Sequence, residues 1–310
     1  MTMARANACI RLGTRASVLA RWQADWVAGR LRQRGVEVEL VPITTQGDRN
    51  AEGPIRALGA TGVFTKEIQQ ALLEDRIDLA VHSLKDLPTE PVPGLVLAAV
   101  PERGPVADAL VARTAASLEQ LPAGAVVGTS SVRRRAQLLH VRPDLVFVPL
   151  RGNVDTRLRK LEAGQCDAVV LAEAGLERLG LQDRISQRLP PEVLLPAVGQ
   201  GALGLETRSD DPASRAAAAM LDHPPTHAAI LAERTLLATL QGGCLAPIAA
   251  WARCDNELLT LWARVVHPDG SHKLETSRSA PLLHAQSLGR QVAETLLAMG
   301  AGVLIRAARL

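Results

Sequence analysis

The chain has 310 residues, of which 47% are hydrophobic and 22% are charged, and its formal net charge is +3 at pH 7. A chain of this length and apolar content can bury a sizeable core, and its length favours two or three domains. The weak net charge, the absence of tyrosine and the presence of only two phenylalanines argue against a nucleic-acid binder, which uses basic surfaces and aromatic stacking platforms.

The N-terminal residues and the cysteine pattern indicate an intracellular location. Met1–Asn7 lacks an apolar signal core, and no stretch reaches the length of a membrane span, so we expect a cytoplasmic protein. The chain has four cysteines: Cys9, Cys166, Cys244 and Cys254. They form no C-x-x-C pair and no zinc spacing, which fits a reducing compartment. His223 and His227 are separated by two prolines, which is typical of a loop and a helix start, and we predict no metal.

The first predicted unit is a strand over residues 9–12, a turn over residues 13–17 and a helix over residues 18–31 with a broad apolar face. Arg15 and Ser17 therefore lie at a strand end. A half-exposed strand follows over residues 36–40. Residues 47–62 have four glycines and little periodicity, so we expect a mobile segment able to cover a cleft.

A second strand end follows the helix predicted from Thr65 to about Arg76. Residues 77–81 form a predicted buried strand, which stops at His82-Ser83-Leu84-Lys85-Asp86-Leu87-Pro88. This pattern places an ammonium and a carboxylate side by side at the carboxyl edge of a sheet. For an isolated pair, however, a solvated Lys85 and a turn-closing Asp86 are the simpler interpretation.

Two consecutive strand–turn–helix units follow a proline-rich stretch over residues 88–105. The first has a strand over residues 126–128, small hydroxyl residues and then three arginines; the second has a strand over residues 145–148 and a turn at Leu150-Arg151-Gly152-Asn153. In a parallel sheet both turns emerge at the same edge, beside helix N-termini that attract anions. The residues expected to converge there are Thr129, Ser131, Arg133, Arg134, Arg151 and Arg157. This set predicts a polyanionic ligand.

The arginines also have a simpler explanation. Arginine outnumbers lysine 31 to 4, so a compositional bias places arginine wherever a cation is tolerated. Three successive residues on a helix cannot all face one ligand, and we expect Arg135 to be solvated or structural. Taken alone, the triplet is a charged helix face; the hydroxyl residues and the second arginine turn make the binding interpretation equally good.

The last third of the chain changes character. A strand over residues 168–171 and a helix over residues 173–179 precede a second proline cluster, and the glycines of Val198–Glu206 suit close backbone packing or a hinge where the chain crosses back. A helix is predicted over residues 226–240, then strands near 248–254, 258–266 and 272–278, with a hairpin turn at His267–Gly270, and a helix over residues 284–299. Cys244 lies in a glycine-flanked loop, where its thiol is either reachable or an inert half-buried group.

Together these segments resemble the porphobilinogen deaminase (hydroxymethylbilane synthase) family over nearly the whole chain. The motifs that carry the resemblance are Arg11–Ser17, Gly62–Glu67, His82–Thr89, Gly128–Arg134, Leu150–Arg157, Gly199–Gly204 and Gly242–Cys244. Each motif alone is modest, but seven in this order are highly specific.

The resemblance implies an α/β fold class: two doubly wound domains resembling periplasmic binding proteins, plus a small α+β C-terminal domain. We place domain 1 at residues 1–103 and 198–221, domain 2 at 104–197 and domain 3 at 222–310. The implied activity is the head-to-tail condensation of four porphobilinogen molecules, with release of ammonia, on a dipyrromethane cofactor attached by a thioether to Cys244.

The resemblance also implies site residues, which agree with the cationic strand ends. Arginine forks that keep their charge suit the acetates and propionates of a polypyrrole chain. Asp86 and Lys85 are the implied catalytic residues. The implied cofactor-binding residues are Cys244, Lys85, Asp86, Thr129, Ser131, Arg133, Arg134, Arg151 and Gly152. The implied substrate-binding residues are Arg15, Ser17, Phe64, Arg151, Arg157, Arg178 and Gln200. Phe64 is explained equally well by core packing.

Two positions depart from the family pattern. Leu245-Ala246 stands where a polar residue and valine are expected, and Glu173 adds a negative charge near a strand end that faces an anionic ligand. The main alternative function is a non-catalytic, two-domain hinge-type receptor for a small polyanion, because fold does not determine function. Such a receptor has no need of Cys244 or of Asp86 among the cations. We expect porphobilinogen and the growing chain as partners, no nucleic acid, no membrane, and a monomer.

Overall fold

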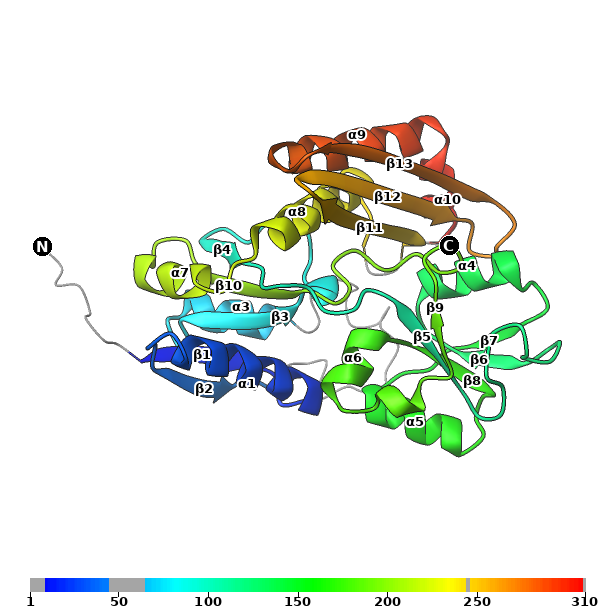
Figure 1. The fold of residues 1–310 in the computed structure, drawn as a ribbon, viewed down its shortest axis with the longest axis horizontal. Helices are drawn as coiled ribbons and strands as arrows, with labels where there is room; N and C mark the ends of the chain where they lie inside the picture. The colour runs from blue at the N-terminus through cyan, green and yellow to red at the C-terminus, as the bar shows by residue number, and fades with distance from the viewer. Residues whose placement is uncertain (1–8, 45–64, 244–245, 309–310) are drawn as a thin grey trace, which may run out of the picture.

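A computed structural model describes residues 9–44, 65–243 and 246–308. It contains three sheets, two of five strands and one of three (Figure 1). Helices flank each five-stranded sheet, and the third sheet is covered by two long helices. The predicted fold class, two α/β units with a small α+β C-terminal unit, is confirmed.

The first α/β unit is built on a sheet of order β2-β1-β3-β10-β4. Its strands are β1 (Ile10–Thr14), β2 (Val38–Pro42), β3 (Leu79–Ser83), β4 (Leu95–Ala99) and β10 (Leu203–Arg208). Its helices are α1 (Val18–Arg32), α3 (Lys66–Leu73) and α7 (Pro212–Ala219). Strand β1 is parallel to β2 and β3, so the turns after β1 and β3 leave the sheet at one edge. Strand β10 runs antiparallel between β3 and β4 and returns the chain to this sheet.

The second α/β unit has a sheet of order β7-β6-β8-β5-β9. Its strands are β5 (Asp108–Ala112), β6 (Val126–Gly128), β7 (Val146–Val148), β8 (Ala168–Ala172) and β9 (Gln187–Leu189). Its helices are α4 (Val132–Val141), α5 (Val154–Glu162) and α6 (Glu173–Arg178). Because β6 is parallel to both β7 and β8, the predicted pair of strand–turn–helix units is confirmed, and their turns share one sheet edge.

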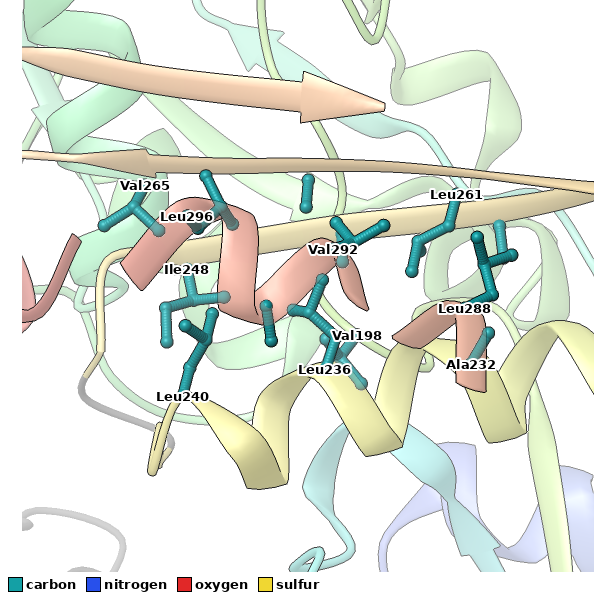
Figure 2. Close-up of a cluster of buried hydrophobic side chains, with 14 of the residues drawn as sticks. Val198, Ala232, Leu236, Leu240, Ile248, Leu261, Val265, Leu288, Val292 and Leu296 are labelled. Atoms are coloured by element: carbon teal, nitrogen blue, oxygen red, sulfur yellow. The ribbon is translucent and has the colours of Figure 1, made fainter. Parts of the chain in front are cut away.

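The C-terminal unit packs two helices against one face of an antiparallel sheet. It comprises α8 (Pro224–Thr239), β11 (Ile248–Asp255), β12 (Leu258–Val266), β13 (Lys273–Pro281), α9 (Ala285–Ala298) and α10 (Ala301–Ala307). Figure 2 shows Leu236 of α8, Val292 of α9 and Leu261 of β12 meeting in its core. The predicted hairpin turn is confirmed, since the His267 N–H donates to His272 at 2.8 Å and Gly270 has a φ of +81°.

Two segments connect the α/β units, residues 100–107 and 190–202, and we call them the connecting segments. They lie against each other: the Gly104 N–H donates to the Gly201 carbonyl at 3.2 Å. Gly201 has a φ of +84°, and a Cβ added there would lie 2.5 Å from the Pro105 carbonyl oxygen. Only glycine permits this approach, which agrees with the close backbone packing predicted from these glycines. The domain boundaries at residues 103/104, 197/198 and 221/222 stay a prediction.

Several elements were not predicted. Strand β4 lies in the proline-rich stretch, and β5, β9, α7 and α10 are short elements whose sequences lack a clear period. Among the described residues, no single helix is long and apolar enough to cross a membrane; the pair Leu282–Ala298 and Ala301–Ala307, bent by 82°, qualifies by length and composition only.

The contact between α8 and α9 generates a stability prediction. A Cβ at Gly289 of α9 would lie 2.3 Å from the Ala232 carbonyl oxygen of α8, whereas a Cβ at Gly29 of α1 would meet nothing within 4 Å. We expect Gly289→Ala to lower the free energy of unfolding by about 1–3 kcal/mol, because backbone must move. The matched change Gly29→Ala is expected to raise it by about 0.5–1 kcal/mol, because alanine favours helix. Chemical denaturation monitored by circular dichroism measures both, and equal effects would contradict the packing described.

Candidate anion-binding active site

Lys85 and Asp86 follow β3 in a single 3₁₀ turn, Leu84–Asp86. Leu84 anchors this turn, since its side chain is buried and its N–H donates to the Ala202 carbonyl at 3.1 Å. Asp86 is half-buried and lines a pocket together with Arg15 and Ser17 from the turn after β1. Side chains from the strand ends after β1 and β3 therefore line one pocket.

Three helices begin with a capping side chain at this side of the sheets. The Ala20 N–H donates to the Ser17 hydroxyl of α1 at 3.3 Å, the Arg134 N–H donates to the Ser131 hydroxyl of α4 at 3.4 Å, and the Thr156 N–H donates to Asn153 of α5 at 2.8 Å. Ser17 and Ser131 thus have structural roles, as does Thr129, whose hydroxyl accepts from the Ser131 N–H at 3.2 Å. Capped helix starts direct their remaining N–H groups and positive dipole ends toward the cleft.

Asp108, at the start of β5, is the buried partner of two of the predicted arginines. Its carboxylate accepts from Arg133 Nη2 at 2.7 Å and from Arg134 Nη2 at 2.6 Å. The further donors of these guanidinium groups bind the carbonyls of Leu195 and Val170 at 2.6 and 2.9 Å. Although burial opposes it, the two arginines hold the pKa of Asp108 below its ordinary value. Asp108 was missed because nothing in the local sequence distinguishes it.

Two of the three consecutive arginines are buried and the third is exposed. Arg133 and Arg134 are 5% and 6% exposed and face the core of the second unit. Arg135 points to solvent, as expected from the sequence. In this conformation their donors bind Asp108 and backbone carbonyls, and the expectation that Arg133 and Arg134 bind a ligand stays a prediction.

Lys85 and Arg157 lie close enough to Asp86 and to neighbouring arginines for these charges to shift one another's pKa. Burial within the cleft lowers the pKa of Lys85 to about 8; Asp86 opposes the shift, while Arg134 and Arg157 reinforce it. Lys85 also keeps a solvent-exposed surface, so water screens part of this effect. Burial, with repulsion from Arg134 and Arg151, lowers the pKa of Arg157 to about 10, against the attraction of Asp86. Because these cations repel one another, binding of an anion among them would stabilise their charged forms.

The turn after β7 positions Arg151 and Arg157. The Arg157 Nε donates to the Gly152 carbonyl at 2.9 Å, and the Lys160 ammonium lies 3.3 Å from the Arg151 carbonyl. Gly152 has a φ of +111°, and a Cβ there would lie 2.5 Å from Thr156 Cγ2. Gly152 therefore permits the turn that precedes α5 and Arg157. The cofactor-binding role expected for Gly152 stays a prediction.

Arg178 and Gln200 contact the connecting segments. Arg178 donates to the Gly201 carbonyl at 2.6 Å and lies 5.8 Å from the Trp22 ring centroid; burial lowers its pKa to about 10. Gln200 is 1% exposed, and its amide nitrogen donates to Val106 and Asp108 at 2.8 and 3.1 Å. Its Oε1 is buried without a hydrogen-bond partner, which leaves an unsatisfied acceptor beside the arginine cluster.

A buried polar network lies beneath the pocket. The His82 ring is 3.0 Å from Glu206 of β10, which also accepts from the Gln69 amide at 3.0 Å. Gln23 of α1 donates to Ser83 at 2.9 Å. These contacts join four elements, α1, α3, β3 and β10, next to the turn that carries Lys85 and Asp86, so they rigidify its base.

One expected departure is corrected. Glu173 was expected to add a negative charge facing the ligand, but its side chain is 6% exposed and accepts a hydrogen bond from Arg188. The ion pair neutralises Glu173 within the second unit. Cys244, Leu245, Phe64 and the segment at residues 47–62 lie outside the described residues.

Comparison of the sequence with family models and with known proteins gives consistent matches over nearly the whole chain. Residues 10–216 match the family model "Porphobilinogen deaminase, dipyromethane cofactor binding domain", and residues 227–298 match "Porphobilinogen deaminase, C-terminal domain". The chain is 48% identical to porphobilinogen deaminase of Syntrophotalea carbinolica over 97% of this chain and 96% of the relative. It is 50% identical to porphobilinogen deaminase of Desulforudis audaxviator over 96% of this chain and 97% of that relative.

The chain also has a fold-level similarity, at low sequence identity, to solved structures. A putative methionine-binding lipoprotein from Bacillus subtilis shares 14% identity, covering 68% of this chain and 89% of its own, with a TM-score of 0.43.

The charge environment of Lys85 generates a prediction. In the Cys244→Ser variant, where no ligand is held through that thiol, we expect Lys85 to titrate near pH 8, below the ordinary lysine value of about 10.4. Arg157→Met is expected to raise the Lys85 midpoint, because it removes a repelling cation. Competitive labelling with an amine reagent between pH 6 and 11, read by peptide mass spectrometry, measures the Lys85 midpoint in both proteins. An ordinary lysine midpoint for Lys85 in Cys244→Ser would contradict the described charge environment.

Proposed function

The chain belongs to the porphobilinogen deaminase family, and we propose that its reaction takes place at Asp86, in the cationic cleft between the two α/β units. It is a transferase that condenses four porphobilinogen molecules head to tail into hydroxymethylbilane with release of ammonia, and it uses a dipyrromethane cofactor. The observation that supports this location for the site is the half-buried carboxylate of Asp86, which interacts with the charges of Lys85 and Arg157.

The cleft fits the cofactor. Dipyrromethane carries four carboxylates and two N–H donors, and the cleft offers mutually repelling cations and the acceptor of Asp86. The residues that would hold the cofactor are Lys85, Asp86, Thr129, Ser131, Arg133, Arg134, Arg151 and Gly152, with Cys244 as the attachment point. When bound, the cofactor supplies a thioether anchor and a free pyrrole α-carbon to which the first new bond is made.

The arginines divide the work of holding carboxylates. Arg151 and Arg157 are only partly buried, and we propose that these two and Lys85 bind acetate and propionate groups directly. Arg133 and Arg134, held by Asp108, contribute a fixed positive potential behind them and align the start of α4. Charge-assisted hydrogen bonds of guanidinium to carboxylate are about twice as strong as neutral ones.

The incoming substrate is proposed to lie nearer the first unit. The proposed substrate contacts are Arg15, Ser17, Phe64, Arg151, Arg157, Arg178 and Gln200. Arg15 and Ser17 share the pocket of Asp86, and the orphan Oε1 of Gln200 can accept a hydrogen bond from a pyrrole N–H or an ammonium.

Asp86 carries the chemistry in this proposal. The aminomethyl group of porphobilinogen is an ammonium near neutral pH, so its C–N bond breaks with the electron pair leaving on ammonia. Positive charge then develops over the substrate pyrrole and its methylene, and the adjacent carboxylate stabilises that charge electrostatically. Asp86 is placed to accept the proton that the attacking pyrrole carbon would release once the new C–C bond has formed. Lys85 balances the carboxylates of the substrate.

We further infer a cytoplasmic monomer that binds neither nucleic acid nor membrane. The weak net charge of the sequence supports the absence of nucleic-acid binding. Size-exclusion chromatography with light scattering tests the oligomeric state.

The role of Asp86 is tested by Asp86→Asn. The amide keeps the shape but cannot stabilise the cation or accept the proton, so we expect turnover to fall about 10²- to 10⁴-fold while the intact mass still includes the cofactor. Asp25→Asn, an exposed carboxylate on α1, is the matched control and should keep wild-type turnover. Wild-type turnover in Asp86→Asn would remove Asp86 from the mechanism.

The arginine assignment is tested by Arg151→Met against Arg135→Met. Loss of a hydrogen bond to a charged group costs about 1.5–3 kcal/mol, so Arg151→Met is expected to raise KM for porphobilinogen about 10- to 100-fold. Arg135 is exposed on the far side of α4, and its replacement should leave KM within about twofold of the wild type. Equal effects of the two changes would show that the cluster does not bind selectively.

A further inference from the structure

Helix α8 of the C-terminal unit contacts the turn that carries Asp86. Ile230 of α8 is fully buried in one cluster with Leu84 and Leu87, the residues immediately before and after Lys85-Asp86. The catalytic turn therefore packs on a helix from a different unit of the fold. Figure 1 shows α8 between the sheet of the first unit and the sheet of the C-terminal unit.

Arg234, one turn further along α8, holds the same turn by its backbone. Its Nη1 donates to the Leu87 carbonyl at 2.9 Å, and its Nη2 donates to the Pro88 carbonyl at 2.6 Å. These carbonyls follow Asp86 by one and two residues. The two arms of one planar guanidinium group thus fix two successive peptide units, a geometry that a lysine ammonium cannot reproduce. Burial lowers the pKa of Arg234, and Glu206 acts in the opposite direction.

The neighbouring residue, Glu233, anchors α8 to other parts of the fold. Its carboxylate is 0% exposed and accepts from Arg103 at 2.6 and 3.1 Å, from the Gly199 N–H at 2.7 Å and from the Ala252 N–H at 2.8 Å. Arg103 and Gly199 belong to the two connecting segments. Helix α8 is consequently tied to both segments and to β11, so Arg234 projects from a rigid element.

The far end of the same helix leads to the cofactor cysteine. Helix α8 ends at Thr239, and Gly242 and Gly243 follow directly before Cys244. Thr239 follows Arg234 by five positions in the sequence, a rise of about 7.5 Å along the helix axis. One helix therefore spans from the turn of Asp86 to the loop of the attachment point.

We propose that Arg234 is a positioning residue for Asp86: it clamps the Leu87 and Pro88 carbonyls to α8, so that the carboxylate keeps its place relative to this helix. The inference rests on the proposed function of Asp86 and Cys244. Arg234 touches neither substrate nor cofactor in this account. It acts by holding the backbone that carries Asp86, and a misplacement of about 1 Å can cost about 10²-fold in rate.

The test compares Arg234→Met, Arg234→Lys and the control Arg290→Met, an exposed arginine on α9. Methionine keeps much of the apolar stem and removes both donors. For Arg234→Met we expect kcat to fall about 10- to 100-fold with KM changed less than about threefold. We also expect faster amide hydrogen exchange within residues 83–90 and an intact mass that still includes the cofactor. Arg234→Lys, with one ammonium for two carbonyls, should lie between wild type and Arg234→Met in kcat and in exchange rate.

Several outcomes would overturn the proposal. One is a kcat for Arg234→Met equal to that of Arg290→Met. Another is an exchange rate in residues 83–90 unchanged from wild type while kcat falls. A third is a fall in kcat fully explained by lost cofactor or unfolded protein. If Arg234→Met does not fold, wild-type kcat in a folded Arg234→Lys would equally contradict the two-carbonyl clamp.

The failure of this inference is separable from failure of the proposed function. If Asp86→Asn is inactive and Arg234→Met behaves like the control, only the clamp is wrong. If Asp86→Asn keeps wild-type turnover, the mechanism itself is wrong, whatever the result for Arg234.

Discussion

The buried carboxylate of Asp108 is the constraint on which the cleft depends. One fully buried anion accepts hydrogen bonds from Arg133, Arg134 and Gln200, and so fixes the start of α4 and the second connecting segment together. Two buried guanidinium groups without it would be uncompensated, at a cost of about 3–5 kcal/mol. Because one carboxylate serves two arginines, a positive charge remains. Lys85, Arg151 and Arg157 add to this positive charge. A ligand with several carboxylates would neutralise it.

A second buried carboxylate, Glu233, performs a comparable task for the C-terminal unit. It binds both connecting segments at their closest approach, where Gly201 packs on Pro105. The three units therefore meet at one place, and the helix that supplies Glu233 also supplies Arg234 to the turn of Asp86. In this arrangement, short, charged, buried contacts tie helix α8 both to the connecting segments and to the turn of Asp86.

Local sequence patterns predicted the parts of this site that depend on local structure. The strand-end positions of Arg15, Ser17, Lys85 and Asp86, and the parallel pairing of β6 and β7, follow from strand and turn signals. The ion-pair partners did not, because they are distant along the chain: Arg103 and Glu233 are 130 residues apart, and Gln200 and Asp108 are 92 apart. Glu173, the first residue of α6, shows the same limit, since its partner Arg188 lies on strand β9 and could not be inferred from the residues around Glu173.

The most direct test of the account is the intact mass of the protein purified from cells that supply porphobilinogen, followed by peptide mapping. We expect a mass above that of the 310-residue chain by two condensed pyrrole units, carried on the peptide that contains Cys244, and no added mass in Cys244→Ser. An unmodified chain, or pyrrole units on a different residue, would contradict the claim that a cysteine-anchored polycarboxylate occupies the cationic cleft.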